Sequence, residues 1–279
     1  MNTVMETGTA QAPMVPRAIR DDGPFTKRLP LYLLGGKRRH VDLDGPALLL
    51  RQTGAADTRY PLARLSRILA GPKIQWSPKA LSACFEGHIP IIFLGKAQEP
   101  IGYLLPVQAN PSPLDETIQE YVTQDRWETG YQHWLRAERM RILHGWRAAR
   151  AFHGHDVSEA EYRELVHVHV YGGEGHIIAG SNLYYGAITA LVAERLVKAG
   201  LNARYWGFGG RTLELSKDIG NLLELVLRLE IHGMGEAIHG SDAALLRILH
   251  VFGDKLQDRC MGILGRLHRT LRERLEQWR

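Results

Sequence analysis

The spacing of hydrophobic positions changes once along the chain, after residue 108. From Pro30 to Pro106, short apolar or alternating runs are separated by glycine, proline and aspartate, a pattern typical of strands joined by turns. The stretch KALSACFEG differs, because Ser77 and Pro78 before it form a helix N-cap and a first helical position. We therefore expect a small β-sandwich or barrel with one helix. The predicted strands are LYLLG, RHVDLD, ALLLRQ, TRYPL, SRILA, KIQW, IPIIFLG and PIGYLLP.

Helical spacing dominates the rest of the chain. ANPSPLDE (109–116) carries two prolines and then an acidic helix start, so it is the expected linker. Residues 117–152 contain no proline and predict one long helix, in which an interruption near Gly130 is left open. Residues 157–171 predict a short helix or a helix that leads into a strand. Three further helices are expected at 181–200, 218–238 and 242–277.

A glycine-rich segment, YWGFGG, precedes RTLELSK and then Asp218. It does not match G-x-G-x-x-G, because Thr212 stands where the third glycine is needed, and no Gly-Lys-Ser/Thr follows it. A tight turn is therefore expected. RTLELSK alternates like a short strand, and IGNLLELVLRLE after Asp218 is helical. Asp218 is then either a helix N-cap or a group with a chemical role.

These patterns predict an α+β protein, with a small N-terminal β-sandwich-like domain followed by a larger all-α domain. The expected division is a flexible tail at 1–25, a β domain at 26–108, the linker at 109–116 and a helical domain at 117–279. The start of the chain lacks the features of a secretion signal, and no apolar run could cross a bilayer, so a cytoplasmic protein is expected. Cys84 and Cys260 sit among apolar residues and are expected to be buried and reduced.

Positive charge gathers on two predicted helices. The net charge of +5 and the pI of about 9.2 permit an anionic partner but do not require one. On each helix the arginines fall within a narrow arc, about 80° wide for the first set. The faces are either solvated or a track for DNA phosphates. The residues are Arg136, Arg139, Arg147 and Arg150 in the first helix, Arg259, Arg266 and Arg269 in the second, and Arg211 beside the glycine turn.

The order of these features resembles that of the CRISPR-associated adaptation integrases, the first of the Cas protein families. LYLLGGKRRHVDLDGPALLLRQ, and then RYPLARLSRILAGPKIQWSPKALSACFEGHIPIIFLGKAQEPIGYLLP, follow the family's succession of strands, a short helix and a glycine-rich hairpin. SNLYYGAITALVAERLVKAGLNARYWGF resembles the family's Asn-Tyr-Gly helix, which ends in Ala-Gly-Leu and runs to Gly-Phe. The resemblance covers most of the chain from the first strand to the last helix.

The resemblance implies DNA cleavage and integration that depend on Mg²⁺ or Mn²⁺. The family site uses a helical Glu, a His after the Gly-Phe turn, an Asp at the head of the next helix and often another acid three residues later. Asp218 falls at the position of the Asp, but Asn221 replaces the second acid and Gly209-Gly210 stand where the His is expected. The resemblance therefore suggests a degenerate site with weak or absent nuclease activity.

The sequence leaves open which residues would supply the Glu and the His of the expected metal site. Glu161 and Glu164 in EYREL, or Glu138 in AERMR, could supply the Glu, although a solvated helix face explains all three. Four histidines are weighed as substitutes for the missing imidazole. His167 and His169 would share a face only in a strand, and His232 and His239 only in a helix.

The resemblance also implies partners: double-stranded DNA, a second copy of the chain bound through the β domain, and the second Cas adaptation protein. Apolar strands such as RILAG would suit a dimer interface. Three functions stay open at this point. They are an active adaptation integrase, a catalytically silent DNA-binding or scaffold subunit, and a helical interaction module without DNA, the last favoured if the arginines are held in salt bridges.

Overall fold

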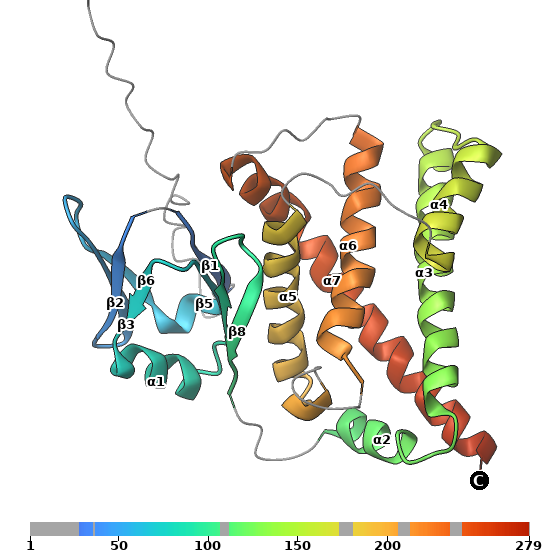
Figure 1. The fold of residues 1–279 in the computed structure, drawn as a ribbon, viewed down its shortest axis with the longest axis horizontal. Coiled ribbons are helices and arrows are strands. Elements are labelled where there is room, and N and C mark those ends of the chain that lie inside the picture. The colour runs from blue at the N-terminus through green and yellow to red at the C-terminus, as the bar shows by residue number, and fades with distance from the viewer. Residues whose placement is uncertain are drawn as a thin grey trace, which may run out of the picture.

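The computed structural model describes residues 28–35, 37–106, 112–172, 181–205, 213–234 and 242–278, so the predicted tail at 1–25 lies outside it. Within these residues, two β-sheets are followed by a set of helices (Figure 1). The predicted α+β class is confirmed. No helix of the described part is long and apolar enough to span a membrane.

Two four-stranded sheets face each other in the N-terminal part. Their strand orders are β1-β5-β7-β8 and β4-β3-β2-β6, with parallel and antiparallel pairs in each. All eight predicted strands are present. Their bounds are β1 Leu29–Leu33, β2 Arg39–Asp44, β3 Ala47–Gln52, β4 Thr58–Pro61, β5 Leu65–Ala70, β6 Ile74–Trp76, β7 Ile91–Leu94 and β8 Pro100–Leu104.

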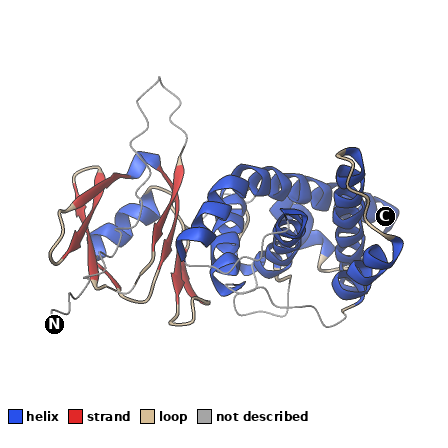
Figure 2. Ribbon diagram, turned by 90° about the horizontal axis from the view of Figure 1, so that it is seen from above, coloured by secondary structure: helices blue, strands red, loops and turns tan. Residues whose placement is uncertain are grey.

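The predicted helix of the β part is α1 (Pro78–Glu86), which lies between the two sheets in Figure 2. It begins as expected, because Ser77 Oγ accepts a hydrogen bond from Ala80 N at 3.2 Å. Its Cys84 is buried in the sandwich core, and burial raises the pKa of this thiol to about 12. Cys84 and Cys260 are both free and buried, as predicted.

Within its described residues, the C-terminal part contains six α-helices. They are α2 Pro113–Tyr121, α3 Trp127–Phe152, α4 Glu159–Tyr171, α5 Ser181–Lys198, α6 Leu215–Met234 and α7 Asp242–Trp278. Helix α2 starts inside the predicted linker, of which residues 109–111 lie outside the description. The long helix expected over 117–152 is divided in two, since α2 and α3 are separated at 122–126, shortly before Gly130, where Arg126 has a left-handed backbone with φ of 59°.

Gly130 does not interrupt the helix but lies inside α3. A Cβ at Gly130 would come within 2.6 Å of Tyr121 Oη. The glycine therefore allows α3 to pack closely against the end of α2, which explains a helix-weakening residue at this position.

Two segments for which a strand was considered are helical. Residues 159–171 are entirely helical, so His167 and His169 do not share a face. The end of RTLELSK is also helical, because α6 begins at Leu215. Leu215, Ile219 and Leu222 are all buried at helical spacing, and this pattern outweighs the short alternation before it.

Helix α5 joins the two parts by packing on the sheet β1-β5-β7-β8 (Figure 1). A Cβ on Gly186 of α5 would lie 2.9 Å from Leu94 Cδ2 of β7, so the glycine brings the helix close to the sheet. Strand β5 is buried along its whole length within this one chain. The expectation that RILAG offers a dimer interface is therefore wrong, because the strand already lies between the sandwich core and α5.

Candidate functional site

Asp218 lies in the first turn of α6 and is half-buried. It is not the N-cap, because its own N–H donates to Glu214 O at 2.9 Å. Its Oδ2 accepts a hydrogen bond from Tyr131 Oη of α3 at 3.0 Å. Burial raises the pKa of Asp218, although the Tyr131 hydrogen bond opposes this change. The carboxylate therefore already has a protein partner on α3.

Tyr131 was not predicted from the sequence. Its side chain is 3% exposed, and burial together with the neighbouring Asp218 raises its pKa well above 10.0. The phenol therefore stays protonated at neutral pH and acts as the donor to Asp218. No local signal joins two residues 87 positions apart.

Three further contacts fix the register of the helices around this pair. Trp146 Nε1 of α3 donates to Leu229 O of α6 at 3.0 Å, so α3 and α6 run in the same direction. Tyr162 Oη of α4 lies 3.0 Å from Nδ1 of His144, and Arg147 pairs with Glu159 at 3.1 Å. Helix α4 therefore runs back along α3 (Figure 1).

This register separates Asp218 from two of the predicted glutamates. Glu161 adjoins Tyr162 and thus lies at the level of His144, which is 13 residues beyond Tyr131 on α3. With a rise of about 1.5 Å per residue, the separation along the helix is about 20 Å. Glu164 is exposed on the same helix α4. The structure therefore does not bring Glu161 or Glu164 together with Asp218.

Glu138, the third candidate, is completely buried and has a structural role. Arg266 Nη2 of α7 donates to its Oε2 at 2.9 Å, Arg266 Nε donates to its Oε1 at 3.1 Å, and Arg141 also donates to it. Two guanidinium groups thus compensate this buried carboxylate and tie α3 to α7. The same pair removes Arg266 from the face predicted to contact DNA.

The described residues do not fit a divalent metal ion. Asn221 follows Asp218 by about one turn and could add one neutral oxygen, whereas Mg²⁺ prefers several oxygen ligands in octahedral geometry. Among the described residues, no group of three His, Cys, Asp or Glu side chains could hold a metal. Gly209, Gly210, Arg211 and His239 lie outside the description, as does the side chain of His232.

The arginines predicted on α3 differ in their contacts. Arg136 is exposed and Arg139 half-buried, and neither has an ion pair within the described part of the chain. Arg147 pairs with Glu159 and stacks over the Tyr162 ring, 4.6 Å from its centroid. Arg150 lies over the Trp146 ring at 5.6 Å. Of these four arginines, Arg136 and Arg139 are the two with no ion pair or ring contact within the described residues, although the charge of Arg139 acts on Asp218.

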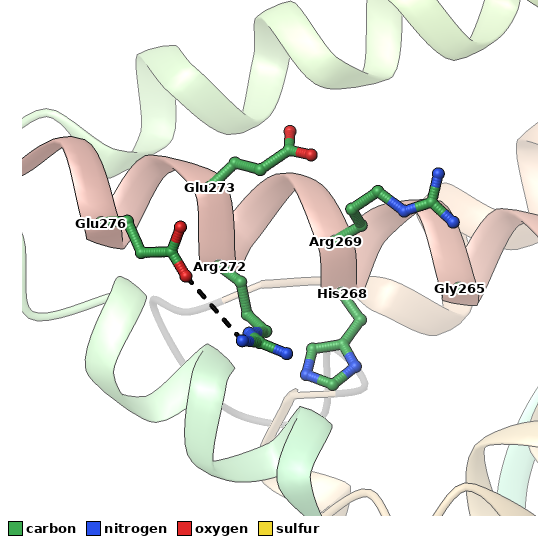
Figure 3. A pocket seen from close by; sticks show the side chains of 6 residues that line it. All are labelled: Gly265, His268, Arg269, Arg272, Glu273 and Glu276. Carbon is green, nitrogen blue, oxygen red and sulfur yellow. Dashed lines mark ion pairs between the residues drawn. The ribbon is translucent and has the colours of Figure 1, made fainter.

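On α7, Arg259 and Arg269 are exposed. Arg269 lines a shallow cleft of about 370 Å³, shown in Figure 3. The cleft has mixed charge, because Arg272 pairs with Glu276 at 3.8 Å and Glu273 also lines it. It is therefore less suited to a phosphate than an open arginine face.

His169 of α4 lies in a positive environment. Its ring is half-buried, and burial lowers its pKa, as do the charges of Arg228 and Arg139. His167 is exposed on the same helix. Within the described residues, neither imidazole belongs to a group of side chains that could hold a metal ion. The charges of Arg228 on α6 and Arg139 on α3 act on His169.

Comparisons with known proteins agree with the fold. The model of the family described as CRISPR associated protein Cas1 matches residues 32–129. A search of curated proteins found no significant match. Among solved structures, the Cas1 protein TM1797 from Thermotoga maritima superposes with a TM-score of 0.62 and 11% identity, over 87% of this chain and 96% of that one.

Two further structures are similar to the chain. TtCas1 in a complex with DNA gives a TM-score of 0.53 and 14% identity, over 87% of this chain and 92% of that one. A chain of a Cas6-RT-Cas1–Cas2 complex gives 0.52 and 13%, over 91% of this chain and 36% of that one. At these identities the superpositions establish a shared fold.

Proposed function

We propose a function from one premise: the chain belongs to the Cas1 family of CRISPR-associated proteins. Within this family, we assign it the role of a DNA-binding subunit of CRISPR adaptation whose own nuclease and integrase activity is weak or lost. The TtCas1 complex with DNA supports DNA as the partner, and the Cas1–Cas2 complex supports a second Cas protein. A second copy of this chain remains a further proposed partner.

The single observation that carries this proposal is the position of Asp218. Its carboxylate accepts the hydrogen bond from Tyr131, and the predicted Glu161 on α4 lies about 20 Å away along α3. Two-metal or one-metal phosphoryl transfer needs several converging ligands to hold the ion. The arrangement of the described side chains favours a helix-pairing role for Asp218 over a catalytic one.

DNA would bind mainly through arginines that make no ion pair within the described residues. Arg136 and Arg139 on α3, with Arg259 and Arg269 on α7, are the proposed contacts, and Arg211, which follows the glycine-rich segment in the sequence, stays a proposed member of the set. Guanidinium groups contact phosphates regardless of base sequence, so affinity should depend steeply on salt. Arg147 and Arg150 would contribute less because their side chains already have protein contacts.

The test is fluorescence anisotropy of a labelled DNA duplex over a range of potassium chloride concentrations. The proposal predicts binding whose affinity falls steeply with salt, and a loss of affinity in an Arg136→Gln, Arg259→Gln double variant. Arg163→Gln is the matched control, since Arg163 is an exposed arginine on α4 outside the proposed set. No binding at low salt, or equal effects of all these substitutions, would contradict a DNA-binding role and favour an interaction module.

A further inference from the structure

Helix α7 exposes one continuous face along most of its length. At about 100° per residue, the exposed residues of this face fall within an arc of about 80°. They are Val251, Asp258, Met261, Gly265, Arg269 and Arg272. The opposite side of α7 is buried in the helical core, where Cys260, Ile263 and Leu267 pack. The exposed residues define the outer face of α7, which the other described elements leave open.

Met261 projects from the middle of the outer face, next to an open space. The residue is 47% exposed. One turn later, a Cβ at Gly265 would meet nothing within 4 Å outside the backbone of its own helix, and Gly265 lines the shallow cleft of about 370 Å³ in Figure 3. Glycine inside a helix lowers the stability of the helix. Unlike Gly130 and Gly186, Gly265 has no close contact in the described chain that requires a glycine.

The outer face carries opposite charges on the two sides of this centre. Asp258 precedes Met261 and Arg269 follows it, and neither charged side chain has an ion pair within the described residues. Both pairs of positions, 258 with 269 and 261 with 265, are centred within one residue of Ile263. A two-fold axis near Ile263 therefore brings each member of a pair to its complement on a second copy: carboxylate to guanidinium, and thioether to open space.

We propose that the outer face of α7 binds the same face of a second copy of this chain, with the two helices antiparallel. Met261 of each copy enters the open space at Gly265 of the other. Asp258 of each copy pairs with Arg269 of the other, so the charge contact occurs twice. A parallel pair would instead place like charges opposite each other, and such contacts oppose binding.

This interface lies on the helical part and is distinct from any pairing through the β part. It does not depend on the proposed DNA-binding function. Few apolar side chains take part, so charge complementarity supplies most of the specificity. The pair is expected to be weak and to weaken further at high salt, because exposed charges are screened. Arg269 is also a proposed DNA contact, so the interface is tested in the absence of DNA.

Sedimentation velocity over a range of micromolar concentrations measures the association. The wild type is expected to associate reversibly, whereas Asp258→Arg and Arg269→Asp should each weaken association by about tenfold or more, because each places two like-charged pairs across the axis. Gly265→Gln should also weaken it but raise the Tm, because glutamine fills the open space and favours a helix more than glycine does. This combination separates loss of the interface from loss of the fold. Arg163→Asp, at an exposed position on α4, is the control and should associate like the wild type.

Exchange of the charges is the sharper arm of the test. An equimolar mixture of the Asp258→Arg and Arg269→Asp proteins should regain association, since each copy then meets opposite charges on the other. A single chain that carries both substitutions should regain it as well. A wild type that stays monomeric, or equal association of the wild type, the two single variants and Arg163→Asp, would overturn the proposal; pairing through the β part alone gives the second outcome. Single variants that recover neither on mixing nor in the double variant would also overturn it.

Discussion

Arg67 of β5 and Glu194 of α5 form a buried ion pair across the junction between the sheets and the helices. Arg67 Nη1 lies 2.5 Å from Glu194 Oε2, and the two side chains are 7% and 3% exposed. Lys198 also donates to Glu194 at 2.6 Å. The β part and the helical part therefore share a charged contact as well as a hydrophobic core, and this contact orients α5 on the sheet.

Breaking this pair should destabilise the protein far more than breaking an exposed one. Glu194→Gln is expected to lower the free energy of unfolding by about 3 kcal/mol, because it leaves Arg67 charged and uncompensated in the interior. Glu159→Gln, which removes a partner of the exposed Arg163, should cost about 0.5 kcal/mol or less. Urea denaturation measures both, and equal losses would show that the buried pair does not hold the junction.

The Arg67–Glu194 pair should make the stability of the fold depend on pH. Burial alone would raise the pKa of Glu194, but Arg67 and Lys198 lower it below its ordinary value of 4.5. A carboxylate with a lowered native pKa stabilises the fold above its unfolded pKa, and this stabilisation is lost as the pH falls through the native pKa. The stability difference between wild type and Glu194→Gln should therefore be full at pH 7 and shrink below pH 4.5. A difference that grows on acidification would be contrary to this sign.

Much of the β part could be predicted from the sequence, because period-two alternation and turn residues are local signals. The eight strands, α1 and its Ser77 cap are of this kind. The strand predicted for RTLELSK is wrong because three or four alternating positions also fit one turn of a helix. The burial of Leu215 and Ile219 at helical spacing favours the helix α6. Likewise, RILAG is as apolar as an interface strand, and only the position of α5 shows that it is already covered.

The candidate site was less predictable, since its contacts join distant residues. Asp218 could be selected from the sequence, whereas Tyr131 could not, because an isolated tyrosine in an amphipathic helix gives no sign of its partner. The predicted arginine faces included Arg266 by angular spacing alone. Spacing cannot distinguish a solvated guanidinium from one that compensates a buried carboxylate such as Glu138.

The ionised carboxylate of Asp218 should lower the free energy of unfolding at neutral pH. Its native pKa is raised above 3.8, mainly by burial, so ionisation favours the unfolded chain as the pH rises through this range. Asp218→Asn keeps an oxygen for Tyr131 and removes the charge, and it is expected to raise the Tm by about 2 °C at pH 8. The gain should be smaller at pH 4. An Asn variant that is less stable than the wild type at pH 8 would argue against a desolvated carboxylate.

Arg136 and Arg266 should respond differently to the same substitution, although both belong to the predicted arginine faces. Arg136→Gln is expected to leave stability unchanged and to lower the slope of log affinity for DNA against log salt by about one. Arg266→Gln should lower the free energy of unfolding by about 3 kcal/mol, because Glu138 then loses its partner on α7. DNA titrations at several salt concentrations, combined with denaturation, separate the two roles. A normal stability of Arg266→Gln would contradict the structural role of the pair.

The most direct measurement is cleavage and integration of a DNA duplex by the purified chain with Mg²⁺ or Mn²⁺, compared with its Asp218→Ala variant. The chain is expected to bind the duplex, cleavage and integration by the wild type are expected to be weak or absent, and Asp218→Ala should change them by less than twofold. Robust metal-dependent activity that is abolished by Asp218→Ala would contradict the account and identify the chain as an active integrase.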